Sequence, residues 1–347
     1  MIKKVTSLLE DAVKQRIFPG CAAAIIEENK KTVLTFGRYT YGVDSLSVNE
    51  NSVFDVASIT KAIPVSSLAL KLIELNKLNL DEPMVSFIPE YNGNYRTEIK
   101  VCHLLTQTLS FSFRLSECKN NTPDQILNCI LNADLKEKPG KFYSYANATS
   151  ILLGMVIERC SGLSLESAAR MYFFDPLEMD HTSFYPEKFD RSCIVPTEID
   201  KWRNGIVQGE VHDESAWALR PMIVGSAGLF STIKDLSNFA QMLINEGNYH
   251  NTSIFDKDTI KSIYQNKYSN SESSIGLGWE LNQPETMGEQ LSKCVFGKTG
   301  FTGCSIAVNP LKKTAYILLS NYLYPERRKD RSEINQIRRK IAEMILN

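Results

Sequence analysis

The segment SITK at residues 58–61 begins an apolar helical pattern that extends over residues 59–76. If these residues form a helix, Ser58 and Lys61 are three positions apart and share one face. A serine at a helix N-terminus lies beside free backbone N–H groups and the positive end of the helix dipole, which favour a developing negative charge. The segment therefore predicts a nucleophile, Ser58, with an amine beside it.

Pro64 falls inside this predicted helix. Because a proline removes one helix hydrogen bond, we expect it to bend the helix or to loosen its first turns. The pKa of an unperturbed lysine is about 10.4, so a neutral amine at pH 7 needs a pKa lowered by about three units. Burial and a neighbouring cation can supply that shift. The same spacing recurs at 116–119 and 231–234, so the motif is weak when taken alone.

The motif Tyr145-Ala146-Asn147 lies on a predicted loop, just before a helix at 148–161. A phenol beside cationic lysines is shifted toward phenolate and can carry a proton. Asn147 offers both an acceptor and a donor to an amide-bearing substrate. The alternative interpretation is a buried structural tyrosine followed by a helix-capping asparagine.

The motif Lys298-Thr299-Gly300 occurs once, inside FGKTGFTG at 296–303, after a β-type run. Its glycines allow the backbone to approach a ligand closely. Lys298 can bind a carboxylate and help to lower a neighbouring pKa. A backbone N–H here can pair with that of Ser58 as an oxyanion hole, where one donor is typically worth about 10²–10³ in rate. The alternative interpretation is a glycine-rich hairpin with an exposed lysine.

The order of predicted helices and strands suggests one architecture for these motifs. An amphipathic helix at 4–16 precedes strand-like runs at 21–27 and 31–38. Near the other end, β-type runs precede a last helix, in the order 275–281, 292–298, 303–309, 314–320 and 326–346. The segments between are mostly helical, at 59–76, 123–133, 148–161, 164–173 and 233–246. We therefore expect an α+β fold, with an antiparallel sheet built from both chain ends, flanked by helices, and an inserted all-helical lobe.

The length of the chain predicts two lobes. Its 347 residues exceed the size at which one hydrophobic core usually stops growing. We expect a discontinuous sheet lobe of residues 1–57 and 272–347 and a mainly helical lobe of residues 58–271. The active site is expected at the interface between them.

Composition and charge make several partners improbable. The formal net charge of −1 gives no electrostatic reason to expect nucleic acid or an anionic membrane as a partner. No apolar run reaches 18 residues, so we expect no membrane span. The basic residues at 327–331 alternate with acidic ones, which predicts a solvated helix face. The four histidines show no metal-ligand spacing, so neither a metal nor another cofactor is expected.

The cysteines and the N-terminus suggest a compartment. Eight cysteines are scattered without a C-x-x-C pair, and several lie in apolar runs, which favours buried reduced thiols in a reducing environment. Residues 1–4 begin like a signal peptide, but Glu10, Asp11 and Lys14 interrupt any apolar core. We expect a cytoplasmic protein.

The three motifs, in this order and these contexts, resemble the serine β-lactamase-related family, which includes penicillin-binding proteins. The resemblance is closest to the class C β-lactamase and esterase branch. It extends from FPGCAAAI at 18–25 to SNYLYP at 320–325, and includes NSVFDVASITK at 51–61 and GSAGLFSTIKDLSNFAQML at 225–243. It implies a β-lactamase/transpeptidase-like fold.

The resemblance also implies roles for the motif residues. Ser58 is then the acylated nucleophile, while Lys61 and Tyr145 manage its proton, and which of these two is the general base stays open. The backbone N–H groups of Ser58 and Phe301 form the oxyanion hole. The residues implied to touch the substrate are Asn147, Lys298, Thr299 and Gly300.

One stretch departs from the family pattern. Members commonly read T-H-T-S-G where this chain reads TQTLS at 106–110, so the loop bordering the site is expected to differ in shape. Lys298 stands where many esterase-like members have histidine. It resembles the lactamase and D,D-peptidase form, which suits a carboxylate-bearing substrate.

We therefore expect a serine hydrolase that forms an acyl-enzyme with a β-lactam, a D-amino-acid peptide or a small ester. The alternative is a penicillin-recognising binding or sensing protein that is acylated without efficient turnover. A Ser-His-Asp triad of the α/β-hydrolase kind is excluded because the chain has no G-x-S-x-G elbow. The expected partner is a small-molecule or peptide substrate.

Overall fold

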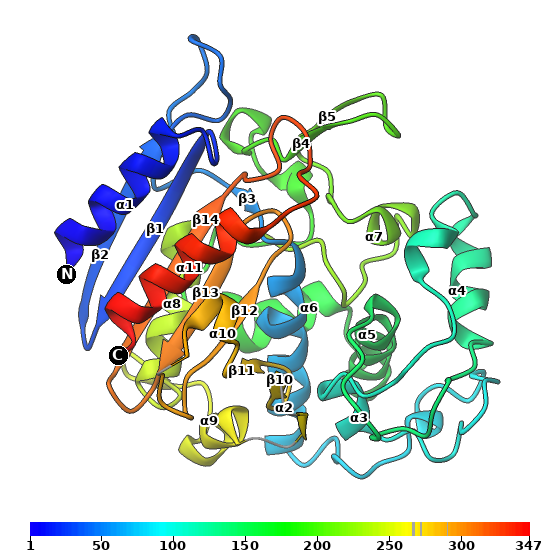
Figure 1. Cartoon of the computed structure of the whole chain (residues 1–347). Coiled ribbons are helices and arrows are strands. Elements are labelled where there is room, and N and C mark those ends of the chain that lie inside the picture. The colour runs from blue at the N-terminus through cyan, green and yellow to red at the C-terminus, as the bar shows by residue number, and fades with distance from the viewer. Residues whose placement is uncertain (266–267, 271–272, 290) are drawn as a thin grey trace.

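The computed structural model describes residues 1–265, 268–270, 273–289 and 291–347, and its centre is an antiparallel sheet (Figure 1). Within these residues, eight strands lie in the order β2-β1-β14-β13-β12-β11-β10-β9. The N-terminal end supplies β1 (Gly20–Glu27) and β2 (Lys30–Gly37). The C-terminal end supplies β9 (Tyr268–Asn270), β10 (Ser273–Ile275), β11 (Glu280–Leu281), β12 (Phe296–Thr299), β13 (Ser305–Asn309) and β14 (Thr314–Ser320). Because β1 pairs with β14, one sheet joins both chain ends, as predicted.

The alternation of side chains along β1 explains why helices cover both faces of this sheet. Every second residue, Cys21, Ala23 and Ile25, packs with α1 (Ile2–Lys14) and α11 (Ser332–Ile345). The residues between them, Ala22, Ala24 and Ile26, face the opposite core, which includes α8 (Ile233–Ile244). Figure 1 shows α1 and α11 in front of the sheet and α8 behind it.

The helix expected at 59–76 is interrupted. Ala57–Lys61 form a 3₁₀ turn, Ala62–Ser66 form a wider turn, and α2 covers only Ser67–Glu74. Ile63 has an extended backbone, with φ −116° and ψ 110°, because the ring of Pro64 disfavours the helical conformation in the residue before it. The predicted effect of Pro64 is confirmed, but the prediction that Ser58 begins a regular helix is wrong.

Three other helices lie where the periodicity predicts them: α4 (Pro123–Leu131), α5 (Asn147–Ser161), and α6 (Leu165–Ala169) continued by Arg170–Phe174. Four short helices were not predicted: α3 (Val101–Leu105), α7 (Glu214–Ala218), α9 (Lys257–Tyr264) and α10 (Pro284–Met287). Three short strand pairs were not predicted, because two or three residues are too few to show an alternating pattern. They are β3 (Phe54–Asp55) with β6 (Phe230–Ser231), β4 (Glu198–Asp200) with β5 (Gly205–Val207), and β7 (Asn248–Tyr249) with β8 (Thr252–Ser253).

The basic segment 327–331 is not the solvated helix face that its charge pattern predicted. The last helix begins only at Ser332, and Arg327 forms ion pairs with Glu198 and Glu214. Charge alternation alone did not reveal these pairs, because both carboxylates lie more than a hundred residues away in the sequence.

The predicted division into two lobes stays a prediction, and its boundary between residues 271 and 272 lies outside the described residues. α8, which falls in the range assigned to the helical lobe, packs against β1, β13 and β14.

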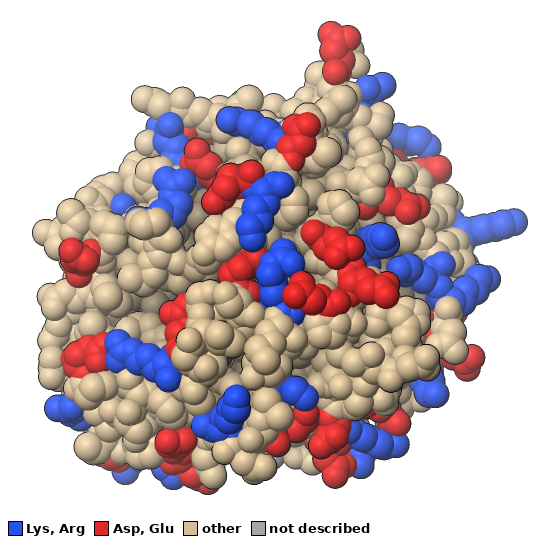
Figure 2. All heavy atoms as spheres, turned by 180° about the vertical axis from the view of Figure 1, so that it is seen from behind, with Lys and Arg blue, Asp and Glu red and all other residues tan. Residues whose placement is uncertain are grey.

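Acidic and basic side chains are interspersed on the face shown in Figure 2. Among the described residues, no single helix is long and apolar enough to cross a bilayer. One pair, α5 with the helix of Leu165–Phe174, passes by length and composition but is bent by 73°.

Candidate active site

Ser58 follows a residue with a strained backbone. Ala57 has φ +49°, a left-handed conformation that is uncommon for residues other than glycine. The buried carboxylate of Asp55 stabilises this conformation of Ala57, because its Oδ1 accepts a hydrogen bond from the Ala57 N–H at 2.8 Å. Its Oδ2 accepts one from the His212 N–H at 2.7 Å. The turn leaves Ser58 partly exposed between buried neighbours.

Lys61 reaches Ser58 from within the same turn. Its Nζ donates to Ser58 Oγ at 3.0 Å and to the carbonyl oxygen of Ser226 at 2.5 Å. Only 3% of Lys61 is exposed, and no carboxylate of the described residues lies within ion-pair distance of its amine. The sequence predicted the contact with Ser58, but not the contribution of Ser226.

Tyr145 lies between the two lysines of the motifs. The Nζ atoms of Lys61 and Lys298 lie 5.1 Å and 4.8 Å from the centre of its ring. Burial of the hydroxyl would raise the pKa of Tyr145, but the charges of both lysines and a hydrogen bond with Ser58 outweigh burial and lower this pKa below its usual value. Tyr145 keeps 45% of its surface exposed, so solvent reaches part of its side chain although the hydroxyl bonds with Ser58.

Lys298 is buried on β12 and forms an ion pair with Glu280 of β11. Burial alone would lower the pKa of Lys298, but the Glu280 carboxylate raises it above the usual value of lysine. Lys298 is therefore a fixed cation at neutral pH, with its charge partly compensated. The sequence did not single out Glu280, although it lies in the family-like stretch GLGWEL at 276–281.

Asn147 is the first residue of α5, and its side chain does not cap this helix. Its Nδ2 donates to Asp213 Oδ2 at 2.9 Å, with Ser215 Oγ more distant at 3.4 Å. Asp213 in turn caps α7 by accepting from the Ala216 N–H at 2.9 Å. The predicted donor to a substrate is therefore shared with a neighbouring helix, whereas the side-chain oxygen of Asn147 accepts no hydrogen bond from the described residues.

Gln107, in the stretch that departs from the family pattern, organises the loop of Tyr145. Its Nε2 donates to Ser150 Oγ at 2.9 Å, and its Oε1 accepts from the Ala146 N–H at 3.1 Å. Its backbone oxygen accepts from the Ser144 N–H at 2.7 Å. The glutamine therefore fixes the backbone on both sides of Tyr145, a role that the sequence did not predict.

The turn after β12 approaches the segment that carries Ser58. A Cβ atom on Gly300 would lie 2.5 Å from the Val56 carbonyl oxygen, so only glycine permits this approach. Thr302 Oγ1 donates to the Asp55 carbonyl oxygen at 2.8 Å. The N–H groups of Ser58 and Phe301 donate to no other backbone group in the described residues, which leaves both open to a ligand. Thr299 is the last residue of β12, beside this turn.

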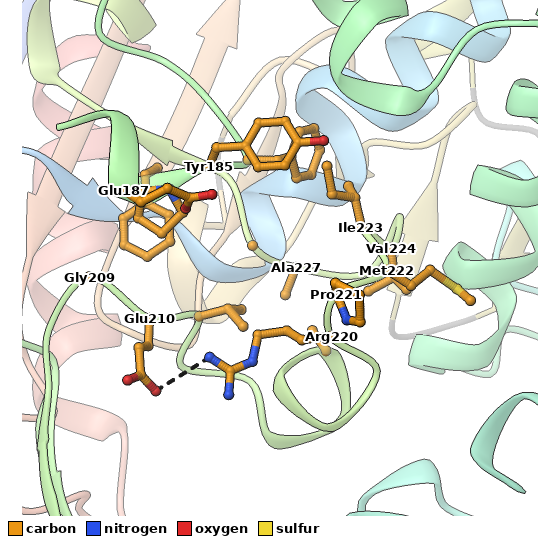
Figure 3. Close-up of a pocket in the computed structure, with 16 residues that line it drawn as sticks. Tyr185, Glu187, Gly209, Glu210, Arg220, Pro221, Met222, Ile223, Val224 and Ala227 are labelled. Carbon is orange, nitrogen blue, oxygen red and sulfur yellow. Dashed lines mark ion pairs between the residues drawn. The ribbon is translucent and has the colours of Figure 1, made fainter. Parts of the chain in front are cut away.

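Two cavities flank α7. A polar cleft of about 640 Å³ is lined by Tyr145, Asn147 and Ser215, and at its other end by Phe113, Arg114 and Lys136. A second pocket of about 450 Å³ has apolar side chains, among them Met222, Ile223 and Val224 (Figure 3). The ion pair of Glu210 with Arg220, at 3.6 Å, lies at the edge of this second pocket.

The structure thus brings the three motifs together from distant parts of the sequence. Ser58, Lys61, Tyr145 and Lys298 form one connected group, with Asn147 beside it and the turn of Gly300 and Phe301 close to the segment of Ser58. This convergence is what the resemblance implied. A family model described as Beta-lactamase matches residues 5–339. The chain belongs to the beta-lactamase family.

Individual relatives agree with this assignment to the beta-lactamase family. A protein of Salmonella agona (strain SL483) named "Putative D-alanyl-D-alanine carboxypeptidase" is 26% identical over 302 residues, which cover 78% of this chain and 69% of that protein. The octameric penicillin-binding protein homologue from Pyrococcus abyssi has a TM-score of 0.75 at 23% identity, over 92% of this chain and 73% of the other. EstCE1, a hydrolase with promiscuous acyltransferase activity, has a TM-score of 0.78 at 18% identity, over 97% and 98%.

The two structural likenesses confirm the predicted α+β fold of the β-lactamase/transpeptidase kind. The family match makes the chain a serine hydrolase or transferase of the beta-lactamase family.

Proposed function

We propose that the protein is a serine hydrolase that forms an acyl-enzyme on Ser58 with a small ester, a D-amino-acid peptide or a β-lactam. The observation that carries the proposal is the contact of Lys61 with Ser58 Oγ, with the phenol of Tyr145 held between Lys61 and Lys298. A serine hydroxyl is a weak nucleophile unless a neighbouring group accepts its proton. The lowered pKa of Tyr145 supports this phenol as the acceptor.

The reaction then proceeds in two steps. Ser58 Oγ bonds to the substrate carbonyl carbon while its proton passes to the Tyr145 phenolate, and the carbonyl oxygen becomes negative. The N–H groups of Ser58 and Phe301 stabilise that oxygen. When the tetrahedral intermediate collapses, the leaving group takes the proton back from Tyr145. Water attacks the resulting ester in the same way and releases the acid.

The ion pair of Lys298 with Glu280 bears on substrate choice. The sequence assigned Lys298 to a substrate carboxylate, but a lysine whose charge is already compensated attracts a second carboxylate less strongly. Arg114 and Lys136 line the polar cleft and form no ion pair within the described residues, so they offer the carboxylate another position. We expect substrates with a distal carboxylate to meet these two cations.

The test is turnover of nitrocefin and of p-nitrophenyl esters by the wild type and by Ser58→Ala. We expect the variant to lose measurable activity, because no other residue supplies the nucleophile. Ser67→Ala, which removes a buried hydroxyl of α2, is a matched control that should keep the wild-type rate. Unchanged turnover by folded Ser58→Ala would refute the proposal.

Labelling with a fluorescent penicillin separates the hydrolase from the alternative, a sensor that is acylated and then stalls. A hydrolase gives a label that disappears at the rate of turnover. Stable labelling of Ser58 without release of product from any of the substrates would favour the sensor.

A further inference from the structure

The peptide bond between Gly300 and Phe301 is trans, so the Gly300 carbonyl and the Phe301 N–H point in opposite directions within one rigid plane. Any contact that fixes the carbonyl also fixes the direction of the N–H. This N–H is one of the two donors proposed for the oxyanion hole, so the partners of the Gly300 oxygen bear directly on the reaction.

Two arginines near the C-terminus hold this oxygen. Arg338 of α11 donates from Nη2 to the carbonyl oxygens of Gly300 and Cys304, both at 2.8 Å. Arg331, which directly precedes α11, donates from Nη2 to the carbonyl oxygens of Gly300 and Phe301, both at 3.3 Å. We call Arg331 and Arg338 the arginine clamp.

No carboxylate of the described residues pairs directly with the clamp, although the more distant charge of Glu280 acts on both arginines and opposes the lowering of their pKa by burial. Only 1% of Arg338 is exposed, and its partners are carbonyl oxygens and Asn335 Oδ1 at 3.0 Å. In the part of the chain that the structure describes, neither arginine of the clamp has a carboxylate at ion-pair distance. Burial lowers the pKa of Arg338 to about 10, so the guanidinium stays charged at neutral pH. A buried cation without a carboxylate in direct contact is costly, and its retention calls for an explanation.

The Gly300 oxygen also accepts from the Gly303 N–H at 3.3 Å, so the clamp and this turn together hold the direction of the Phe301 N–H. α11 packs on the face of the sheet that also carries α1, whereas Ile59 and Ala62, on either side of Lys61, belong to the core on the opposite face. Because the Gly300 carbonyl points toward α11, the Phe301 N–H points toward the side of Ser58. The Phe301 ring is held as well, stacked on His212 at 5.8 Å and 4.7 Å from the Arg331 guanidinium.

We propose that Arg331 and Arg338 are positioning residues of the oxyanion hole, which aim and polarise the peptide bond between Gly300 and Phe301. This inference rests on the proposed acylation of Ser58. Charged donors on a carbonyl draw electron density from the amide, so its N–H becomes a stronger donor. The clamp charge gains a further negative partner, across one peptide group, when the substrate oxygen becomes negative. It therefore contributes to kcat more than to substrate binding.

The experiment compares Arg338→Gln and Arg331→Gln with the control Arg339→Gln, which removes an arginine of the same helix that pairs with Glu343. The substrates are p-nitrophenyl acetate and its thionoester, in which sulfur replaces the carbonyl oxygen and fits an oxyanion hole poorly. We expect each clamp variant to lose about tenfold in kcat for the oxygen ester, with little change in KM. Removing an oxyanion-hole donor lowers the rate by about 10²–10³, whereas these variants only weaken the Phe301 N–H as a donor. The preference for the oxygen ester over the thionoester should shrink by the same factor.

Two results would overturn the inference. The first is an unchanged kcat and an unchanged ester preference in folded clamp variants, and the second is an equal loss for both substrates, which indicates general structural damage. If Arg338→Gln does not fold, as judged by circular dichroism and thermal unfolding, Arg331→Gln decides by the same criteria, because Arg331 is only partly buried. Ser58→Ala distinguishes the two proposals: if it is inactive while the clamp variants keep the full ester preference, the clamp alone is refuted.

Discussion

The two lysines that flank Tyr145 have opposite surroundings. On one side, Lys61 donates only to neutral oxygens, those of Ser58 and Ser226. On the other side, Lys298 faces the carboxylate of Glu280. Both amines are buried and lie at similar distances from the phenol ring. The difference is therefore one of charge balance and not of geometry.

This difference indicates a division of labour between the two sides. No carboxylate in contact with Lys61 offsets its charge at the Ser58 oxygen and the Tyr145 phenol in the described residues. The carboxylate of Glu280, in contrast, offsets part of the charge of Lys298. Lys61 accordingly has a larger effect than Lys298 on the pKa of Tyr145, after the opposing effect of burial. Five variants follow, and the first four of them test this comparison.

Replacing either lysine with methionine should have the largest effect and should be unequal. We expect Lys61→Met to lower kcat/KM by about 10³ and Lys298→Met by about 10², within the range that a proton-transfer group contributes. The measurement is p-nitrophenyl ester turnover, with Lys261→Met, at a partly exposed position of α9, as the control. Equal losses at both positions would contradict the division of labour.

Tyr145→Phe removes the phenol but keeps the ring between the lysines. We expect a loss of about 10² in kcat/KM, at the low end for general acid–base catalysis. Because the pKa of Tyr145 is lowered, the phenolate forms as pH rises through a value below 10, and wild-type activity should rise along that limb. A pH–rate profile of the variant should lack the limb. A limb that survives would show that Tyr145 is not the group responsible for it.

Glu280→Gln removes the carboxylate that distinguishes the two sides. Glu280 raises the pKa of Tyr145, so its loss should lower that pKa further and move the rising limb of the profile to lower pH. Turnover at neutral pH should change by about tenfold or less, since one pKa unit corresponds to a factor of ten in the ratio of protonated to ionised groups. A shift to higher pH would show that Glu280 does not act through its charge. Glu285→Gln, a nearby change on α10, is the control.

Glu198→Gln should have the smallest effect on rate and a clear effect on acid stability. Burial opposes ionisation of Glu198, but His212 and Arg327 outweigh burial and lower its pKa from 4.5 to about 2. A carboxylate with a lowered pKa stabilises the fold above pH 4.5, and this contribution is lost as pH falls toward 2. Thermal unfolding between pH 2 and 7 should show that slope in the wild type and a flatter one in the variant. Equal slopes would mean that the contacts of Glu198 with His212 and Arg327 add no stability.

The sequence predicted the parts of the site that short motifs carry. Each motif needs its residues at fixed local positions, so the convergence of Ser58, Lys61, Tyr145 and Lys298 could be expected before the structure. Glu280 and Ser226 could not be found in this way, because they act through one carboxylate and one backbone oxygen brought close only by strand pairing and loop packing.

The clamp shows a second reason for a missed contact. Arg331 was missed because the run of alternating charges at 327–331 is typical of a solvated surface, and because the last helix was expected to start six residues too early. Arg338 lies outside that run, within the part of the last helix that was predicted correctly. Whether a basic side chain turns inward depends on which carbonyl oxygens lie beneath it. That information belongs to the tertiary structure, since Gly300 is 38 residues from Arg338.

The pairing of β1 with β14 has a consequence for how the molecule is made. Cys21 lies opposite Ser320, so the N-terminal hairpin leaves the ribosome long before its partner strand exists. At ~5–20 residues per second, the delay is roughly 15 to 60 seconds, during which one edge of β1 has no neighbour to bond with. An unpaired apolar edge strand is prone to aggregation. The nascent chain is therefore expected to depend on a chaperone or on rapid translation until its last hundred residues emerge from the ribosome.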